Sequence, residues 1–258
     1  MATVRFSDDF PVAGCVQMIS RDTVDYRDGS HALQGWLVDA RDSSRPVPGV
    51  LVFHEYMGLG DYLERPLEKL ARLGYVVMAA DMYGKGVRPD NAEAALGLCR
   101  PLRADRKAMR RRARAAFECL RQCDGVDPQR IAAVGYSFGG CTALELARSG
   151  AAICAAVSFY GYLDTPLPAA EGAIRARLLV FHGLHDPVVS LQSLAAYYEE
   201  MAAARADSRV ITYADAGHGF CNRHPDGSQE PWNRYSRRHD ERSWKSLAAF
   251  LDESLSRL

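Results

Sequence analysis

Blocks of apolar residues alternate with amphipathic segments from about residue 50 onward. Continuous apolar runs are typical of strands that are covered on both faces. Such runs predict strands at residues 50–54, 75–80, 131–134, 153–160, 178–181 and 210–213. Helical spacing of apolar residues predicts helices at residues 61–73, 103–123, 191–206 and about 241–255, and a small-residue, helix-prone run begins at Cys141. Strands that alternate with helices favour a mostly parallel sheet with helices on both faces.

The first part of the chain has a different pattern. Residues 17–20 and 32–38 flank a turn at Asp28 and Gly29, which predicts an N-terminal antiparallel hairpin. The sequence contains no repeat and no linker-like segment, and 258 residues suffice for one large α/β domain. We therefore expect a single domain over residues 1–258.

Composition and charge exclude several classes of protein. Lysine plus arginine and aspartate plus glutamate each number 32, so the net charge gives no indication of a nucleic-acid partner. The basic run at residues 103–114 is interpreted as the solvated face of an amphipathic helix. No segment approaches the roughly 18 apolar residues of a membrane span. We expect neither nucleic acid nor membrane as a partner.

The cysteines do not form a recognisable framework. There are seven, an odd number, and they are scattered; Cys119 and Cys123 lie four residues apart without a matching second pair. This is neither a zinc pattern nor a disulfide framework. We expect reduced thiols, a cytoplasmic location and no bound metal.

A serine between two glycines carries the main chemical signal. The segment Gly135-Tyr136-Ser137-Phe138-Gly139 follows a predicted strand and precedes a helix-prone run. G-x-S-x-G between a strand and a helix is the signature of a nucleophile elbow, a sharp turn that exposes the serine hydroxyl. Ser137 is therefore the candidate nucleophile.

A serine hydroxyl needs a base within hydrogen-bonding reach, and the base needs an acid that orients it. His218, in a glycine-flanked loop directly after the strand 210–213, fits the base. Asp186, just after the strand 178–181, fits the acid; Asp215 and Asp164 are its rivals. His182 and His185 are interpreted as structural or pocket residues.

The oxyanion that develops during attack on a carbonyl also needs hydrogen-bond donors. The backbone N–H of Phe138, at the start of the helix after the nucleophile, is one candidate. The second is expected from the loop after the strand 50–54, and the N–H of Tyr56 is our choice.

These residues resemble the dienelactone hydrolase family of α/β hydrolases, and the resemblance runs through most of the chain. It rests on five motifs in order and on a tryptophan near the start of the last helix: residues 54–58, 80–84, 135–140, 183–187 and 216–220, and Trp244. The resemblance implies an α/β-hydrolase fold and an ester- or lactone-cleaving activity without a cofactor. Members of the family commonly use a cysteine nucleophile, and Ser137 stands at that position here.

The resemblance also implies a substrate pocket formed by Glu55, Tyr83, Lys85, Asn222 and Arg223. Glu55 matches a pocket glutamate that modulates the nucleophilic thiol. Beside a serine it either bonds to the pocket wall or acts on substrate. Lys85 and Asn222, with Arg223 beside it, match two arginines that grip a substrate carboxylate. Lysine is a point charge and asparagine is uncharged, so bidentate recognition of a carboxylate is not preserved.

The sequence thus predicts a serine hydrolase that cleaves small-molecule carboxylic esters or lactones through an acyl-enzyme, as a monomer or a homodimer. The alternatives on the same site are a thioesterase, a sugar-ester deacetylase or a peptidase, since this fold hosts all of them. A hydrolase-derived protein that binds a ligand without turnover is a further alternative. Residues 221–235 are polar with two prolines, and we expect a surface loop that borders the pocket.

Overall fold

One twisted sheet organises the computed structural model, which describes residues 20–41, 45–223 and 232–256. Within these residues the sheet has eight strands in the order β1-β2-β4-β3-β5-β6-β7-β8. The pairs β1–β2 and β2–β4 are antiparallel and all other pairs are parallel. The strands are β1 Ser20–Asp28, β2 His31–Asp39, β3 Val47–Phe53, β4 Val76–Ala80, β5 Val126–Tyr136, β6 Ala155–Phe159, β7 Arg177–Gly183 and β8 Ser208–Tyr213.

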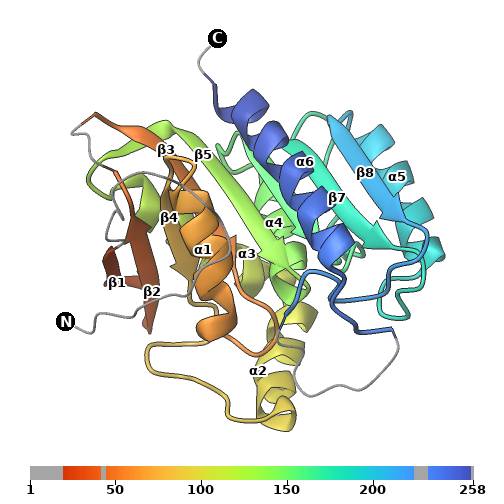
Figure 1. The fold of residues 1–258 in the computed structure, drawn as a ribbon, viewed down its shortest axis with the longest axis horizontal. Coiled ribbons are helices and arrows are strands. Elements are labelled where there is room, and N and C mark those ends of the chain that lie inside the picture. The colour runs from red at the N-terminus through yellow and green to blue at the C-terminus, as the bar shows by residue number, and fades with distance from the viewer. Residues whose placement is uncertain (1–19, 42–44, 224–231, 257–258) are drawn as a thin grey trace.

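Helices cover both faces of this sheet (Figure 1). They are α1 Glu64–Ala71, α2 Ala92–Ala104, α3 Arg106–Arg121, α4 Phe138–Arg148, α5 Leu191–Ala203 and α6 Arg237–Leu255, and a 3₁₀ turn at Asp61–Leu63 precedes α1. Helices α1 and α6 pack on one face, and α3, α4 and α5 pack on the other. The predicted α/β-hydrolase architecture, with its mostly parallel sheet and N-terminal antiparallel hairpin, is confirmed.

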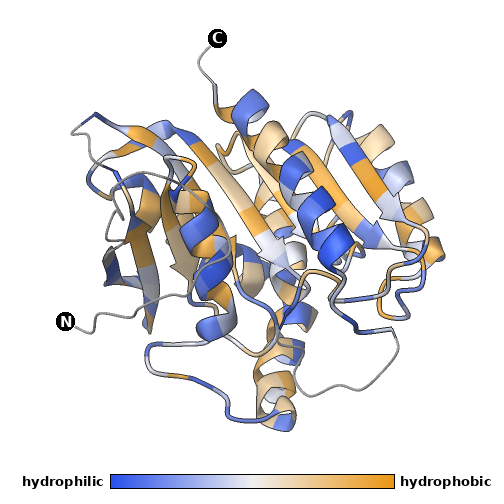
Figure 2. Cartoon of the chain, viewed as in Figure 1, coloured by the Kyte–Doolittle hydropathy of each residue, from blue (hydrophilic) through white to orange (hydrophobic). Residues whose placement is uncertain are grey.

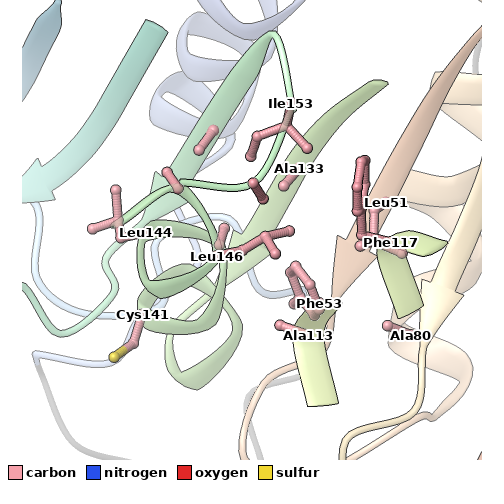
Figure 3. Close-up of a cluster of buried hydrophobic side chains, with 14 of the residues drawn as sticks. Leu51, Phe53, Ala80, Ala113, Phe117, Ala133, Cys141, Leu144, Leu146 and Ile153 are labelled. Carbon is pink, nitrogen blue, oxygen red and sulfur yellow. The ribbon is translucent and has the colours of Figure 1, made fainter. Parts of the chain in front are cut away.

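The strand sequences explain why both faces are covered. Side chains of a strand alternate between faces. In β3, Leu51 and Phe53 join the core beneath α3 and α4, whereas Val50 and Val52 join the core beneath α1 and α6. Figure 2 shows the apolar residues concentrated in the sheet. Figure 3 shows Leu51 and Phe53 in the cluster that also contains Leu146 of α4.

Two predicted elements are wrong in their bounds. The helix expected at residues 103–123 is α3, which begins only at Arg106 because the backbone of Asp105 leaves the helical region (φ −97°, ψ 84°). Residues 103 and 104 end α2, a helix that the sequence pattern did not predict. The carboxylate of Asp105 caps α3 by accepting the N–H of Ala108 at 2.9 Å. In the hairpin, the first strand is Ser20–Asp28 rather than residues 17–20, of which residues 17–19 lie outside the described residues.

The interpretation of the basic run as a solvated helix face holds only in part, since Lys107, Arg111 and Arg114 are exposed. Arg106 and Arg112 are buried, at 3% and 8% exposure. The fully buried carboxylate of Glu145 on α4 accepts the Nε–H of Arg110 at 2.7 Å and an N–H of Arg148 at 3.1 Å. This buried ion-pair network ties α3 to the helix that follows the candidate nucleophile.

None of the helices in the described part of the chain combines the length and apolar character that crossing a bilayer requires. The six cysteines described there all carry free thiols.

Candidate active site

Ser137 lies in a strained turn between β5 and α4. Its backbone has φ 52° and ψ −113°, and a positive φ is costly for a residue with a Cβ. The N–H of Ser137 donates to the carbonyl of Phe159 at 2.9 Å, which ties the turn to the end of β6. A Cβ at Gly135 would collide with the carbonyl of Gly139, and a Cβ at Gly139 would collide with that of Phe53. Both glycines of the motif are therefore required by close backbone contacts.

The structure brings Ser137, His218 and Asp186 together. Ser137 Oγ lies 2.9 Å from His218 Nε2, and His218 Nδ1 lies 2.8 Å from Asp186 Oδ2. The other carboxylate oxygen of Asp186 accepts the N–H groups of Val188 and Val189 at 2.7 and 3.1 Å. With Nδ1–H donating to Asp186, Nε2 is left to accept the serine hydroxyl. These contacts fit a Ser–His–Asp triad.

Each of the three residues follows a different parallel strand. Ser137 follows β5, Asp186 follows β7 and His218 follows β8. Carboxyl ends of parallel strands meet at one edge of a sheet, where sites in open α/β folds form. The two loops are also joined directly, because the N–H of His185 donates to the carbonyl of Ala216 at 2.9 Å.

The rival acids are occupied elsewhere. Asp215 is exposed, forms an ion pair with Arg238 and lies 3.0 Å from Nε2 of His239. Asp164 is exposed and lies near Arg103 at the end of α2 and Arg106 at the start of α3. Among the other histidines, buried His182 donates from Nε2 to the carbonyl of Val189 at 2.9 Å, which supports the loop that carries Asp186.

The loop after β3 lies beside the start of α4, because Gly139 closely approaches the carbonyls of Phe53 and His54. The carbonyl of Tyr56, in this loop, accepts a hydrogen bond at 2.6 Å from the hydroxyl of Tyr83, which follows β4. The two expected oxyanion donors, Tyr56 and Phe138, thus belong to adjoining segments.

His54 is a residue whose role sequence reasoning missed. It is fully buried, donates from Nδ1 to the carbonyl of Glu55 at 2.6 Å and accepts the N–H of Met82 at Nε2, 3.1 Å away. Burial lowers the pKa of His54 to about 4, so the ring is neutral. It ties the ends of β3 and β4 together beneath the ring of Tyr83, 4.8 Å away between centroids. The sequence signal that could have indicated this role is the position of His54 at the end of a buried strand.

Glu55 is held by two donors. The hydroxyl of Tyr160 donates to Oε1 at 3.0 Å, and the side-chain amide of Asn222 donates to Oε2 at 2.9 Å. Tyr160 is buried, has a positive φ of 41°, and its ring lies edge-on to that of His218 with 5.1 Å between centroids. Burial raises the pKa of Tyr160 well above its usual value, so it remains a donor. Tyr160 was missed because it ends an apolar run that predicted only a strand.

The remaining predicted pocket residues lie apart from one another. Lys85 forms an ion pair with Asp25 of the N-terminal hairpin at 2.6 Å, and both side chains are largely exposed. Arg223 lies 3.7 Å from Asp240 of α6. With Glu55 and Asn222, Arg223 lines a cavity between α1 and α6. Of the loop expected to border the pocket, residues 224–231 lie outside the described residues.

The parallel sheet, the strained serine turn at the end of β5 and the hydrogen-bonded acid and base after β7 and β8 define an α/β hydrolase. A comparison with protein families identifies the family of α/β hydrolases to which the chain belongs. The chain belongs to the dienelactone hydrolase family, whose model matches residues 33–255.

Individual relatives agree with this assignment. The chain is similar to the solved structure named m3DLH, with 37% identity, a TM-score of 0.88 and coverage of 92% of this chain and 99% of that one. A dienelactone hydrolase-like promiscuous phosphotriesterase from metagenomic libraries has 34% identity, a TM-score of 0.86 and the same coverage. A carboxymethylenebutenolidase from Pseudomonas sp. is 30% identical over 187 residues, which cover 67% of this chain and 74% of the relative. The protein is therefore a hydrolase that acts on esters or lactones.

Proposed function

We propose that Ser137, His218 and Asp186 are the catalytic triad of a serine hydrolase for small carboxylic esters and lactones. The observation that carries this proposal is the unbroken chain of two hydrogen bonds, 2.9 Å from Ser137 to His218 and 2.8 Å from His218 to Asp186. Nucleophile, base and orienting acid must be linked in this order for the serine to be activated.

The mechanism has two halves. Nε2 of His218 takes the proton of Ser137 as Oγ attacks the carbonyl carbon of the substrate. His218 then protonates the leaving alcohol oxygen, and an acyl-enzyme remains on Ser137. In the second half His218 activates a water molecule, the water releases the acid, and the proton returns to Ser137. Asp186 keeps the ring oriented and stabilises its positive charge. Every proton is carried by His218, so the mechanism needs neither a metal nor a cofactor.

The backbone N–H groups of Phe138 and Tyr56 are the proposed donors to the oxyanion. Their adjoining positions support this assignment, as does the Tyr83 hydroxyl that fixes the carbonyl of Tyr56 at 2.6 Å. One donor of this type contributes about 3 kcal/mol to the lowering of the barrier.

The side chains predicted to line the substrate pocket favour neutral substrates. Lys85 is paired with Asp25, and Asn222 donates to Glu55, so the two positions that match carboxylate-binding arginines of the family both have protein partners. We therefore propose uncharged small esters or lactones rather than carboxylated dienelactones. In this assignment Glu55 bonds to the pocket wall through Tyr160 and Asn222.

The decisive experiment is labelling with a fluorophosphonate probe followed by mass spectrometry. We expect one adduct, on Ser137, and hydrolysis of p-nitrophenyl acetate that Ser137→Ala abolishes. Ser30→Ala, which removes an exposed hydroxyl in the hairpin turn, is the matched control. Equal, slow hydrolysis by the wild type and Ser137→Ala would reject the triad and favour a binding protein without turnover.

A panel of acyl donors separates the alternatives. A thioesterase prefers thioesters to oxygen esters of the same acid, a sugar-ester deacetylase prefers acetylated sugars, and a peptidase cleaves anilides. We propose that oxygen esters and lactones give the highest kcat/KM.

We also propose that residues 1–258 form one domain, present as a monomer or homodimer in the cytoplasm. The continuous sheet from β1 to β8 supports the single domain, and the free thiols support a reducing compartment. Size-exclusion chromatography with light scattering tests the oligomeric state.

A further inference from the structure

A cavity of about 90 Å³ is lined by residues of α1 and α6. These two helices lie on the same face of the sheet (Figure 1). The inner end of the cavity is formed by Glu55 and Tyr160, and Ser137 and His218 are not among its described lining residues. A cavity needs about 10–15 Å³ to hold one water molecule, so this one accommodates several waters or one small organic ion.

Three cationic side chains line this cavity: Arg65 and Lys69 from α1, and Arg223. The carboxylate of Asp240 accepts an N–H of Arg65 at 2.8 Å and lies 3.7 Å from Arg223. One negative charge is thus shared between two guanidinium groups. Of the other carboxylates in the wall, Glu55 is already held by Tyr160 and Asn222, and Asp61 is exposed at the rim.

Lys69 has no carboxylate partner within the described part of the chain. Its ammonium lies 3.8 Å from the ring centroid of Trp244, a cation–π contact. Burial, together with the positive charge of Arg65, lowers the pKa of Lys69 to about 8, and the negative charge of Asp240 acts in the opposite direction. The charged form of Lys69 is therefore poorly compensated, although the side chain reaches a cavity large enough for a counter-ion.

We propose that this cavity is a second ligand site, separate from the triad, which binds a small monocarboxylate anion. The carboxylate lies against Lys69 and Arg223, and the hydrocarbon part lies against the ring of Trp244. An anion here supplies the missing partner of Lys69, and the carboxylate of Glu55 keeps it away from the inner end of the cavity. Binding at this site does not require a catalytic triad, although short carboxylates are also products of ester cleavage.

The test uses lysine side chains as reporters, because the chain has only four: Lys69, Lys85, Lys107 and Lys245. Reductive methylation with ¹³C-formaldehyde preserves their charge and gives one NMR signal for each, and loss of a signal in Lys69→Met assigns that residue. The protein carries Ser137→Ala, so that no acyl-enzyme forms and the outcome is independent of the proposed function. Sodium butyrate is then titrated against sodium chloride at equal ionic strength.

We expect butyrate to shift the Lys69 signal saturably and to raise its apparent pKa by about one unit, as an opposite charge within contact distance does. The other three signals are expected to stay in place. Arg223→Gln should weaken binding at least about threefold, whereas Arg209→Gln, an exposed arginine of β8, should not change it. If methylation does not reach Lys69, the fluorescence of Trp244, with Trp36 and Trp232 replaced by Phe, supplies the same titration. An identical response to butyrate and chloride, or none up to 100 mM, overturns the proposal.

Discussion

Replacing Asp186 by asparagine is expected to inactivate the hydrolase through the tautomer of His218. One oxygen of Asp186 accepts two backbone N–H groups, from Val188 at 2.7 Å and Val189 at 3.1 Å. An asparagine must place its carbonyl oxygen there, because an amide NH₂ cannot accept hydrogen bonds. Its NH₂ group then faces Nδ1 of His218 and donates to it. The ring proton moves to Nε2, which can no longer accept the hydroxyl proton of Ser137.

The size of the effect follows from this loss of the base. In Ser–His–Asp triads, conversion of the acid to its amide lowers kcat about ten-thousandfold while the geometry stays intact. This corresponds to about 5.5 kcal/mol at 1.36 kcal/mol for each factor of ten. Because Asp186 is 5% exposed, water does not replace its contact with the ring. We expect an almost unchanged KM and a fall in kcat of this order.

The assay is steady-state hydrolysis of p-nitrophenyl acetate over pH 6–9, with circular dichroism to confirm that the variant folds. Asp215→Asn is the matched control, since Asp215 pairs with Arg238 on the surface, and we expect its kcat/KM within about twofold of the wild type. A folded Asp186→Asn protein that keeps more than a tenth of the wild-type kcat would refute the reasoning. So would an Asp215→Asn protein that loses activity to the same extent.

Three further predictions concern stability. Glu145→Ala removes the buried carboxylate that pairs with Arg106 and Arg110, whereas Arg148 keeps Glu200 as a partner at 2.6 Å. It should lower the free energy of unfolding by about 3–5 kcal/mol in urea denaturation; a loss under 1 kcal/mol contradicts this. Gly139→Ala should prevent stable folding because its Cβ meets the carbonyl of Phe53, whereas Gly97→Ala, with open space in α2, should gain up to about 1 kcal/mol. In the folded protein the pKa of Lys69 is lowered to about 8. Lys69 of the unfolded chain therefore keeps its proton to a higher pH than Lys69 of the folded protein. Relative to Lys69→Met, the wild type should therefore become more stable as pH rises from 8 toward 10, and the opposite slope would contradict the lowered pKa.

The fold and the triad contacts were predictable because their signals are local or follow from topology. Gly135 and Gly139 mark a turn that only glycines permit. Parallel strands place whatever follows them at one edge, so a glycine-flanked His218 and the Asp186 segment had to lie near that turn. The roles of these residues stay predictions until tested, but their proximity was readable from the chain.

The misjudged parts depend on tertiary contacts that a single sequence does not show. The arginines of α3 have the pattern of a solvated helix, and only the packing of α4 against α3 makes Glu145 their buried partner. Asp105 breaks the predicted helix because its carboxylate accepts the N–H of Ala108 and caps α3. Lys85 pairs with Asp25, sixty residues earlier, which no short motif reveals. Strand β1 is an edge strand, and its polar outward residues concealed its alternation.

Every residue of α4, from Phe138 to Arg148, is buried. No position on that helix faces solvent, so any exchange there disturbs a neighbour on β3, β5, β6 or α3. Laboratory evolution of this enzyme will therefore find little freedom around the nucleophile. Altered selectivity has to come from connecting segments that start at the carboxyl edge of the sheet, such as residues 164–173 between β6 and β7, which are exposed or half-buried and can change length and chemistry while the helix stays as it is.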